Sequence, residues 1–512
     1  MIIVYHTDDK IISIDNADSD LISNDNNLAI RDFILALAKE YSNEIIVWCD
    51  ERLKKHLNIS EIQNLFHHHK MMLSYNPNST NFFDNEIGYV ETTPFINVNK
   101  KVSYPTWQMS SLVGAVHASV LIALKEEKTA ENNFDYFLSS LAKLAMPLGL
   151  LCYSEPRLLT TELVDVKFPR ANTNTLFRFV KEHYRSRWVF LLLLNLIIYE
   201  KRFPVIAFFR SLFFKKKMLA TVFENVEVRP SKDAVLNQTI DVVIPTIGRK
   251  KYLYDILKDL SEQTLLPEKI IIVEQNPDER SQSELDYLTN ESWPFVIEHV
   301  FTHQAGACNA RNLALEQITS EWVFFADDDI RIESDFIKKA LDNINLAGAK
   351  AVSICCLQEG EKQIFNTVFQ WDSFGSGCSF VLAESLKNCK FSMGFEFGFG
   401  EDSDFGRQLR NQGCDILYLP EPKILHLKAP IGGFRTKPVL SWQNDLIQPK
   451  PSPTVMLSLV LHQTKEQVLG YKTTLFFKYY KHQKIKNPIA YFFNFRKQWD
   501  RSVFWANELN KK

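Results

Sequence analysis

Three apolar runs in the second half of the chain alternate with segments of helical periodicity. The runs are TIDVVIP (239–245), KIIIVEQN (269–276) and EWVFFADDD (321–329). Segments 252–263 and 310–318 lie between them and place apolar residues at the spacing of an amphipathic helix. Strands that alternate with helices in this way predict βαβ units, so the fold class is α/β with a parallel sheet. In such sheets, ligands bind beyond the carboxyl ends of the strands.

The first half repeats this pattern in a weaker form, with strand-like runs at 1–6 and 43–51. Three segments recur in the same order in both halves, 108–121 with 370–383, 151–160 with 417–426, and 174–187 with 473–486. A period this long predicts two domains of like fold rather than a solenoid. We therefore expect a first copy over 1–165, a basic helical linker over 166–235, a second copy over 236–440, and the remainder of a long inserted loop with basic C-terminal helices over 441–512.

Composition excludes several classes of protein. The 59 basic and 61 acidic residues give a net charge of −2, which argues against a dedicated nucleic-acid binder. The eight cysteines form no CxxC pair, which favours free thiols in a reducing compartment. The N-terminus carries no secretory signal, and the longest apolar run, 188–199, is too short to span a bilayer. We expect a cytoplasmic protein.

An acidic triplet, Asp327 to Asp329, follows the third apolar run directly. Carboxylates that lie close together disfavour one another's ionisation unless a cation neutralises them. Oxygen ligands of this kind suit Mg²⁺ or Mn²⁺. The alternative interpretation is a solvated acidic turn that caps the next helix.

A second acidic cluster, formed by Glu401, Asp402 and Asp404, comes before a helical segment that closes at Gly413. Carboxylates at a helix N-terminus are also explained by capping. This cluster holds more acids than one cap requires, however, and a carboxylate beside a bound cation can accept a proton from a hydroxyl. His426 ends the strand-like segment 417–426, and a lone histidine beside apolar residues is more often a core or surface residue than a ligand.

The order of these motifs, PTIGR, EQN, GACNARN, FFADDD, GEDSDFGRQL and EPKILH, resembles that of the family 2 glycosyltransferases. The resemblance covers about residues 240–435. It implies the GT-A fold, a Rossmann-like mixed sheet flanked by helices, and an inverting transfer of a sugar from a nucleotide donor. The N-terminal half then resembles a degenerate copy of the same fold.

The resemblance assigns the donor side of the site. It implies that Pro245, Thr246 and Arg249 contact the nucleotide and that Arg311 contacts the diphosphate or the base. Glu274 stands where the family has an aspartate that holds the base, and this departure leaves the identity of the base open; a UDP-linked sugar is favoured. Asp327 and Asp328 fall on the donor side of the acidic motif.

The resemblance also assigns the chemistry. Asp329 and His426 would hold the divalent metal, Mn²⁺ or Mg²⁺, and Asp402 would be the catalytic base. Glu401 would contact the acceptor, a glycan or a lipid-linked glycan of surface polysaccharide synthesis. The insert after His426 takes the place of a lid over the donor and acceptor.

Two alternatives remain at this point. A non-catalytic scaffold that binds sugar nucleotides or glycans would not need all the acids, and a sugar nucleotidyltransferase would release pyrophosphate instead of nucleoside diphosphate.

Segment 167–217 holds twelve basic and two acidic residues, and segment 465–512 holds eleven basic and three acidic residues. Basic segments rich in aromatic residues suit an anionic membrane surface, so the chain is expected to lie peripherally on the inner face of the cell membrane. Helices that pack on the domains with solvated charges are the alternative.

Overall fold

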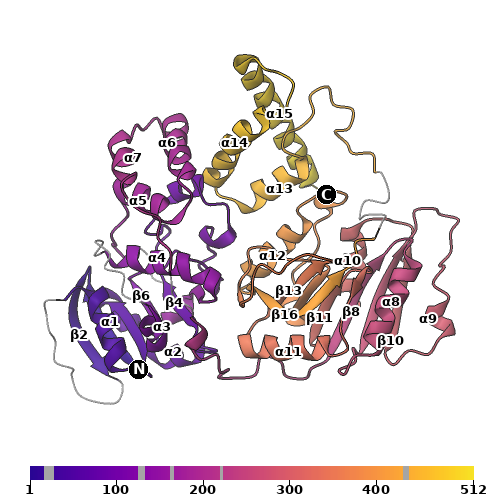
Figure 1. The fold of residues 1–512 in the computed structure, drawn as a ribbon, viewed down its shortest axis with the longest axis horizontal. Helices are drawn as coiled ribbons and strands as arrows, with labels where there is room; N and C mark the ends of the chain where they lie inside the picture. The colour runs from indigo at the N-terminus through magenta and orange to yellow at the C-terminus, as the bar shows by residue number, and fades with distance from the viewer. Residues whose placement is uncertain (17–27, 125–132, 162–165, 220–222, 430–437, 512) are drawn as a thin grey trace. The chain divides into compact units, whose positions relative to one another are not determined.

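The computed structural model describes residues 1–16, 28–124, 133–161, 166–219, 223–429 and 438–511 (Figure 1). The chain forms two compact units. Unit 1 comprises residues 1–232 and 463–482, and unit 2 comprises residues 233–462 and 483–512. Residues 430–437, which form part of the predicted lid, lie outside the described residues.

Unit 1 is built on a mixed seven-stranded sheet in the order β2-β1-β3-β6-β4-β7-β5. Its central strands β1 and β3 are almost entirely buried, as expected for parallel strands that are covered on both faces. The strands are β1 (Ile2–Thr7), β2 (Lys10–Asn16), β3 (Ile45–Asp50), β4 (Met71–Tyr75), β5 (Tyr104–Pro105), β6 (Val113–His117) and β7 (Leu151–Ser154).

Most helices of unit 1 contribute to one apolar core with this sheet, although the core contains no residue of 59–65. They are α1 (Ile30–Glu40), α2 (Ile59–Leu65), α3 (Ala118–Ala123), α4 (Phe134–Ala145), α5 (Thr173–His183), α6 (Arg187–Glu200), α7 (Val205–Ser211) and, from near the end of the chain, α14 (Lys465–Tyr480). A capping box starts α14, since the Thr464 hydroxyl accepts from the amide of Gln467 and the Gln467 side chain accepts from the amide of Thr464. Gln467 also donates to the backbone oxygens of Glu91 and Thr93, which ties α14 to unit 1.

Unit 2 is built on a nine-stranded mixed sheet in the order β10-β9-β8-β11-β15-β13-β16-β12, with β14 also paired to β16. The three apolar runs of the sequence form its parallel centre, β8 (Ile240–Thr246), β9 (Lys269–Gln275) and β11 (Trp322–Ala326), which confirms the predicted α/β class. The other strands are β10 (Val296–Thr302), β12 (Ile330–Arg331), β13 (Ala351–Gln358), β14 (Phe369–Gln370), β15 (Cys378–Leu382) and β16 (Ile416–His426).

Helices flank this sheet as the periodicity of the sequence requires. In α8 (Lys250–Ser261), the buried residues Leu253, Ile256, Leu257 and Leu260 follow the helical spacing. The others are α9 (Tyr287–Asn290), α10 (Ala307–Leu315), α11 (Phe336–Ala347), α12 (Glu401–Asn411), α13 (Pro453–His462) and α15 (Pro488–Leu509). None of the helices in the described part of the chain combines the length and the apolar character that crossing a membrane requires.

Six strands of each sheet share one spatial order. Reading across unit 1 gives β1, β3, β6, β4, β7 and β5, and reading across unit 2 from β8 gives β8, β11, β15, β13, β16 and β14. Successive neighbours are parallel, antiparallel, antiparallel, parallel and antiparallel in both sheets. The corresponding strands also occur in the same order along the chain. The third repeated segment does not follow this equivalence, because α5 and α14 both belong to unit 1.

Candidate active site

The carboxyl ends of two parallel strands of unit 2 bring the first candidate residues together. Thr246 ends β8, and the triplet Asp327 to Asp329 follows β11, its direct neighbour. The hydroxyl of Thr246 donates to Oδ2 of Asp328 at 2.7 Å. The predicted placement of polar residues at the strand ends therefore holds for these side chains.

Arg249 neutralises two of the three acids. Its Nη1 lies 2.5 Å from Oδ1 of Asp328 and 2.8 Å from Oδ2 of Asp329. Burial raises the pKa of Asp328 to about 6, although Arg249 and the hydroxyl of Thr246 act in the opposite direction. A single guanidinium thus holds Asp328 and Asp329 side by side.

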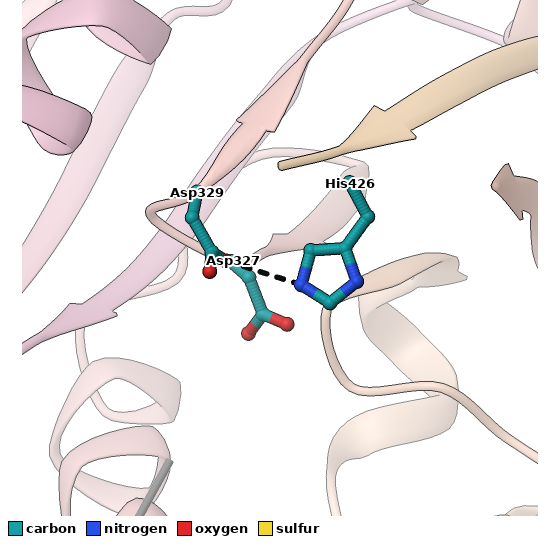
Figure 2. Close-up of side chains that lie close together, drawn as sticks. All are labelled: Asp327, Asp329 and His426. Atoms are coloured by element: carbon teal, nitrogen blue, oxygen red, sulfur yellow. Dashed lines mark ion pairs between the residues drawn. The ribbon is translucent and has the colours of Figure 1, made fainter. Parts of the chain in front are cut away.

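Three side chains form a group that fits a metal ion, Asp327, Asp329 and His426 (Figure 2). Each offers a ligand atom, and these atoms lie within 4.8 Å of one another. His426 reaches the group because β16 pairs with the short β12, which sets His426 opposite Ile330. Its Nε2 lies 3.4 Å from Oδ1 of Asp329. Two carboxylates and one imidazole form a donor set that Mn²⁺ accepts.

The pKa values in this group follow from the mutual contacts. Burial acts to raise the pKa of Asp329, but His426, the amide of Ala429 and Arg249 outweigh it and lower the pKa. The hydrogen bond to Asp329 raises the pKa of His426. The surroundings withdraw Asp327 from water and raise its pKa, and the charges of Asp329 and Asp402 raise it further. A divalent cation would relieve this repulsion.

Arg311 enters the site from α10. Its Nη2 lies 3.4 Å from Oδ1 of Asp327, while its buried Nε has no hydrogen-bond partner among the described residues. The guanidinium therefore has a donor left for an anionic ligand.

The N-terminus of α10 is held by Gln275, which belongs to the EQN motif, and by Glu396, which the sequence did not single out. The carboxylate of Glu396 accepts from the amides of Cys308 and Asn309 at 3.2 and 2.8 Å. The side-chain oxygen of Gln275 accepts from the amide of Gly306 at 2.6 Å. Gly306 has φ of +150°, and a Cβ there would lie 2.3 Å from the Glu396 carboxylate, so only glycine fits. Motif order carried no signal for these contacts, which are formed only in the folded chain.

The second acidic cluster divides into two roles at the start of α12. Asp404 is fully engaged, since it accepts from Ser392 at 2.5 Å, from Gln408 at 2.7 Å and lies 2.7 Å from Nε2 of His462. Asp402 differs, because its Oδ1 is buried and has no hydrogen-bond partner in the described structure. Burial raises the pKa of Glu401, and the charge of Asp402 adds to this effect.

One cavity of about 350 Å³ joins these groups. Of the residues predicted from the sequence, it is lined by Pro245, Thr246, Arg249, Arg311, Asp327, Asp328, Asp329, Glu401 and His426. Gln275, Gly306 and Glu396 also line it. Glu274 and Asp402 are not among its described lining residues, although Asp402 is close enough to influence the pKa of Asp327.

Glu274 is committed to a contact outside the cavity. Its Oε2 lies 2.9 Å from Nε2 of His299 on the neighbouring strand, β10. Burial acts to raise the pKa of Glu274, but His299 and Ser283 outweigh it and lower the pKa. The next residue, Gln275, faces the cavity instead, because successive side chains of a strand point to opposite faces.

Comparison with known proteins gives one family model and several similar proteins. The family model described as Glycosyl transferase family 2 matches residues 241–391. The succinoglycan biosynthesis protein ExoM of Rhizobium meliloti is 26% identical over 201 residues, which cover 36% of this chain and 64% of the relative. The chain therefore matches less than two thirds of the length of that protein.

Two solved structures align with parts of this chain. TarS 1–349 of S. aureus in complex with UDP-GlcNAc aligns with a TM-score of 0.35 and 15% identity over 53% of this chain and 88% of that one. GalNAc-T7 with UDP, GalNAc and Mn²⁺ aligns with a TM-score of 0.29 and 11% identity over 40% and 48%. The family model thus agrees with the predicted resemblance, because residues 241–391 of unit 2 are similar to glycosyl transferase family 2.

Proposed function

We propose that this chain is a metal-dependent, inverting glycosyltransferase that moves a sugar from a nucleotide donor to a hydroxyl of a glycan or lipid-linked glycan. The observation that carries the proposal is the grouping of ligand atoms of Asp327, Asp329 and His426 within 4.8 Å, near Asp402, whose buried Oδ1 has no hydrogen-bond partner among the described residues. The biosynthetic name of the R. meliloti relative supports a role in polysaccharide synthesis. All eight cysteines are free, in keeping with a cytoplasmic site of action.

The donor side is formed by cations and by the acids that orient them. Arg249 and Arg311 both line the cavity, and planar guanidinium groups suit the oxygens of a diphosphate. Arg249 would exchange its present contacts with Asp328 and Asp329 for the diphosphate. A divalent ion held by Asp327, Asp329 and His426 would neutralise the charge that develops on the leaving diphosphate. A UDP-linked donor is the first to test.

The acceptor side is formed by the start of α12. Asp402 would accept the proton of the acceptor hydroxyl through its unpartnered Oδ1 as that hydroxyl attacks the anomeric carbon. Attack opposite to the leaving diphosphate inverts the anomeric centre, as in the single displacement of inverting glycosidases. Glu401 lines the cavity, and the raised pKa of its carboxyl suits a hydrogen bond to an acceptor hydroxyl.

The substitution Asp402→Asn tests the base. We expect a loss of transfer of about 10²- to 10⁴-fold, the usual contribution of a positioned base. Affinity for UDP in the presence of Mn²⁺ should not change, because Asp402 is not among the described residues that line the cavity. Ser403→Ala, at the exposed position next in the chain, is the matched control.

The assay follows nucleoside diphosphate release and the anomeric configuration of the product. Near wild-type turnover by Asp402→Asn would show that another group is the base, and Glu401→Gln would then be the next variant to measure. Release of pyrophosphate from a nucleoside triphosphate would refute the proposal in favour of a nucleotidyltransferase. No sugar-nucleotide turnover by the intact chain would favour a scaffold.

We also propose that unit 1 is a duplicate of this fold that has lost the metal position. Asp50 donates its amide to Leu112 just as Asp327 donates to Gly377, and both acids close the equivalent pair of strands. Two residues after Asp50, unit 1 has Arg52 at the position where unit 2 has Asp329. Its Nε and Nη2 each lie 2.7 Å from an oxygen of Asp50, so a guanidinium neutralises the acid where a cation would bind.

Mn²⁺ titration followed by electron paramagnetic resonance tests the loss of this site. We expect one Mn²⁺ site in the chain, abolished by Asp329→Ala and unchanged by Asp50→Ala. A site that is lost in Asp50→Ala would show that unit 1 binds metal.

A further inference from the structure

Unit 1 exposes large apolar side chains from α6 to the segment that follows α7. Phe213 is 88% exposed, Met218 is 72% exposed and Ile206 is 70% exposed. We call this set the apolar patch; its members are Phe190, Phe203, Val205, Ile206, Phe209, Phe213 and Met218. Such exposure is unusual for a surface that only faces water and marks an interaction site.

The apolar patch is continuous from α6 to α7. The rings of Phe190 and the buried Phe208 lie edge to face at 5.0 Å, and Phe208 lies 5.2 Å from Phe209. Helices α5, α6 and α7 are neighbours in unit 1 (Figure 1). The buried side of α7 therefore fixes its exposed side, which carries Ile206 and Phe209.

Two anchors hold the segment after α7 with its remaining residues facing outward. The guanidinium of Arg178 lies 4.6 Å from the centre of the Phe214 ring. Nζ of Lys217 lies 2.8 Å from Oε2 of Glu182, a buried carboxylate. Residues 213, 215, 216 and 218, which flank these anchors, are all exposed. Phe213 is therefore exposed because Phe214 and Lys217, on its C-terminal side, are held by unit 1.

The charge around the apolar patch is positive. Arg210, Lys215 and Lys216 are exposed and form no ion pair within the described residues. The two acids of segment 167–217 are both engaged, Glu182 with Arg178 and Lys217, and Glu200 with Arg202. No acid of this segment is left to balance the three cations.

We propose that the apolar patch docks unit 1 onto an anionic lipid bilayer. Phenylalanine and isoleucine side chains enter the boundary between headgroups and acyl chains, and Arg210, Lys215 and Lys216 meet the anionic headgroups. The 14 residues of α6 reach about 21 Å, short of the ~30 Å hydrocarbon layer, so the helix lies on the bilayer and does not cross it. The inference does not depend on the transfer reaction.

Sedimentation of the full chain with vesicles tests the docking. One set of vesicles contains phosphatidylcholine alone and the other contains added phosphatidylglycerol. We expect the chain to sediment with the anionic vesicles at low salt and to be released by high salt. Lys215→Gln combined with Lys216→Gln should lower the partition coefficient about 25-fold, about fivefold for each basic residue. Ile206→Ser combined with Phe213→Ser should lower it at any salt concentration.

Matched changes elsewhere serve as the control. Lys362 and Ile364 are exposed in unit 2, so Lys362→Gln combined with Ile364→Ser should sediment as the wild type does. Circular dichroism checks that the patch variants are folded, as we expect because the substituted side chains are exposed.

Three results would overturn the proposal. In the first, the chain stays in the supernatant with both kinds of vesicle. In the second, the patch variants bind as well as the wild type, or only changes at Phe492 and Phe493 of α15 reduce binding. In the third, analytical ultracentrifugation shows a dimer that Phe213→Ser dissociates, which would make the apolar patch an interface between copies of the chain.

Discussion

Gly377 offers a way to move one acid of the metal group without removing it. A Cβ built at this position would lie 2.1 Å from Oδ2 of Asp327, whereas real Cβ atoms essentially never approach within 3.0 Å. In Gly377→Ala the oxygen must therefore withdraw by about 0.9 Å, the difference between these distances. The backbone of Gly377 is outside the left-handed region, so alanine adds no backbone strain.

The expected cost falls on metal binding and not on folding. A displacement near 1 Å is enough to weaken a positioned group about 100-fold, and a disturbed metal ligand typically loses about 10- to 100-fold in affinity. The side chain of Asp327 is only partly buried, 39% exposed, and lines the cavity, so it can shift without disturbing the apolar core. The free energy of unfolding should accordingly change by less than about 1 kcal/mol.

Calorimetric titration with Mn²⁺ and with UDP measures the first effect, and urea unfolding measures the second. Gly375→Ala is the matched control, because its Cβ would meet Sγ of Cys378 at 2.7 Å and no carboxylate. Equal Mn²⁺ affinity in Gly377→Ala and the wild type would refute the assignment of Asp327 to the metal. An equal loss in both glycine variants would show that the loop, and not the acid, is responsible.

Two further variants probe groups that the motifs did not reveal. Glu396→Ala removes the acceptor of two amides at the start of α10, so we expect a loss of about 1 kcal/mol in thermal unfolding. It should also raise the KM for the donor more than it lowers kcat, because Arg311 is carried by that helix. In unit 1, burial opposes ionisation of Glu91, but Lys143 and other donors lower its pKa to about 2 from the ordinary 4.5. The lowered pKa stabilises the fold at neutral pH by about 3 kcal/mol, and this stabilisation is lost as the pH falls from 4.5 towards 2. We therefore expect Glu91→Gln to unfold at a lower urea concentration than the wild type at pH 7. Near pH 2 the two proteins should unfold at similar urea concentrations.

The central strands of unit 2 could be predicted from the sequence because their apolar character is continuous. The predicted strand at 239–245 is observed as Ile240–Thr246, and the one at 269–276 as Lys269–Gln275. Parallel strands covered on both faces need apolar residues on both faces, and this requirement is visible without knowledge of their neighbours. The antiparallel strand β15 carries no such signal, and 19 residues separate it from its neighbour β13 and 51 from its neighbour β11.

The acids of the candidate site were visible for a similar reason, since Asp327 to Asp329 follow a strand without interruption. Glu396 was not, and the role of Gln275 in the EQN motif was not either, because each acts on the N-terminus of α10 from a distant part of the chain. Glu274 shows the converse case. A motif position predicted a role on the donor, but the partner of its carboxylate is His299, which only the pairing of β9 and β10 brings near.

The two units have equivalent strands but different residues at the ends of those strands, so the contribution of the fold to the site can be separated from that of the side chains. Both sheets place an acid at the end of the same strand, Asp50 in unit 1 and Asp327 in unit 2, with the same backbone contact to the neighbouring strand. The strand order is therefore not what distinguishes a candidate active site from a neutralised one. The difference lies two residues further along, where Asp329 adds a second carboxylate to the group and Arg52 binds the first one. In unit 1 the guanidinium that binds the acid lies two residues along the same chain segment, whereas Asp327 and Asp329 are paired with Arg311 and Arg249, which reach them from other elements and would exchange these contacts for a diphosphate.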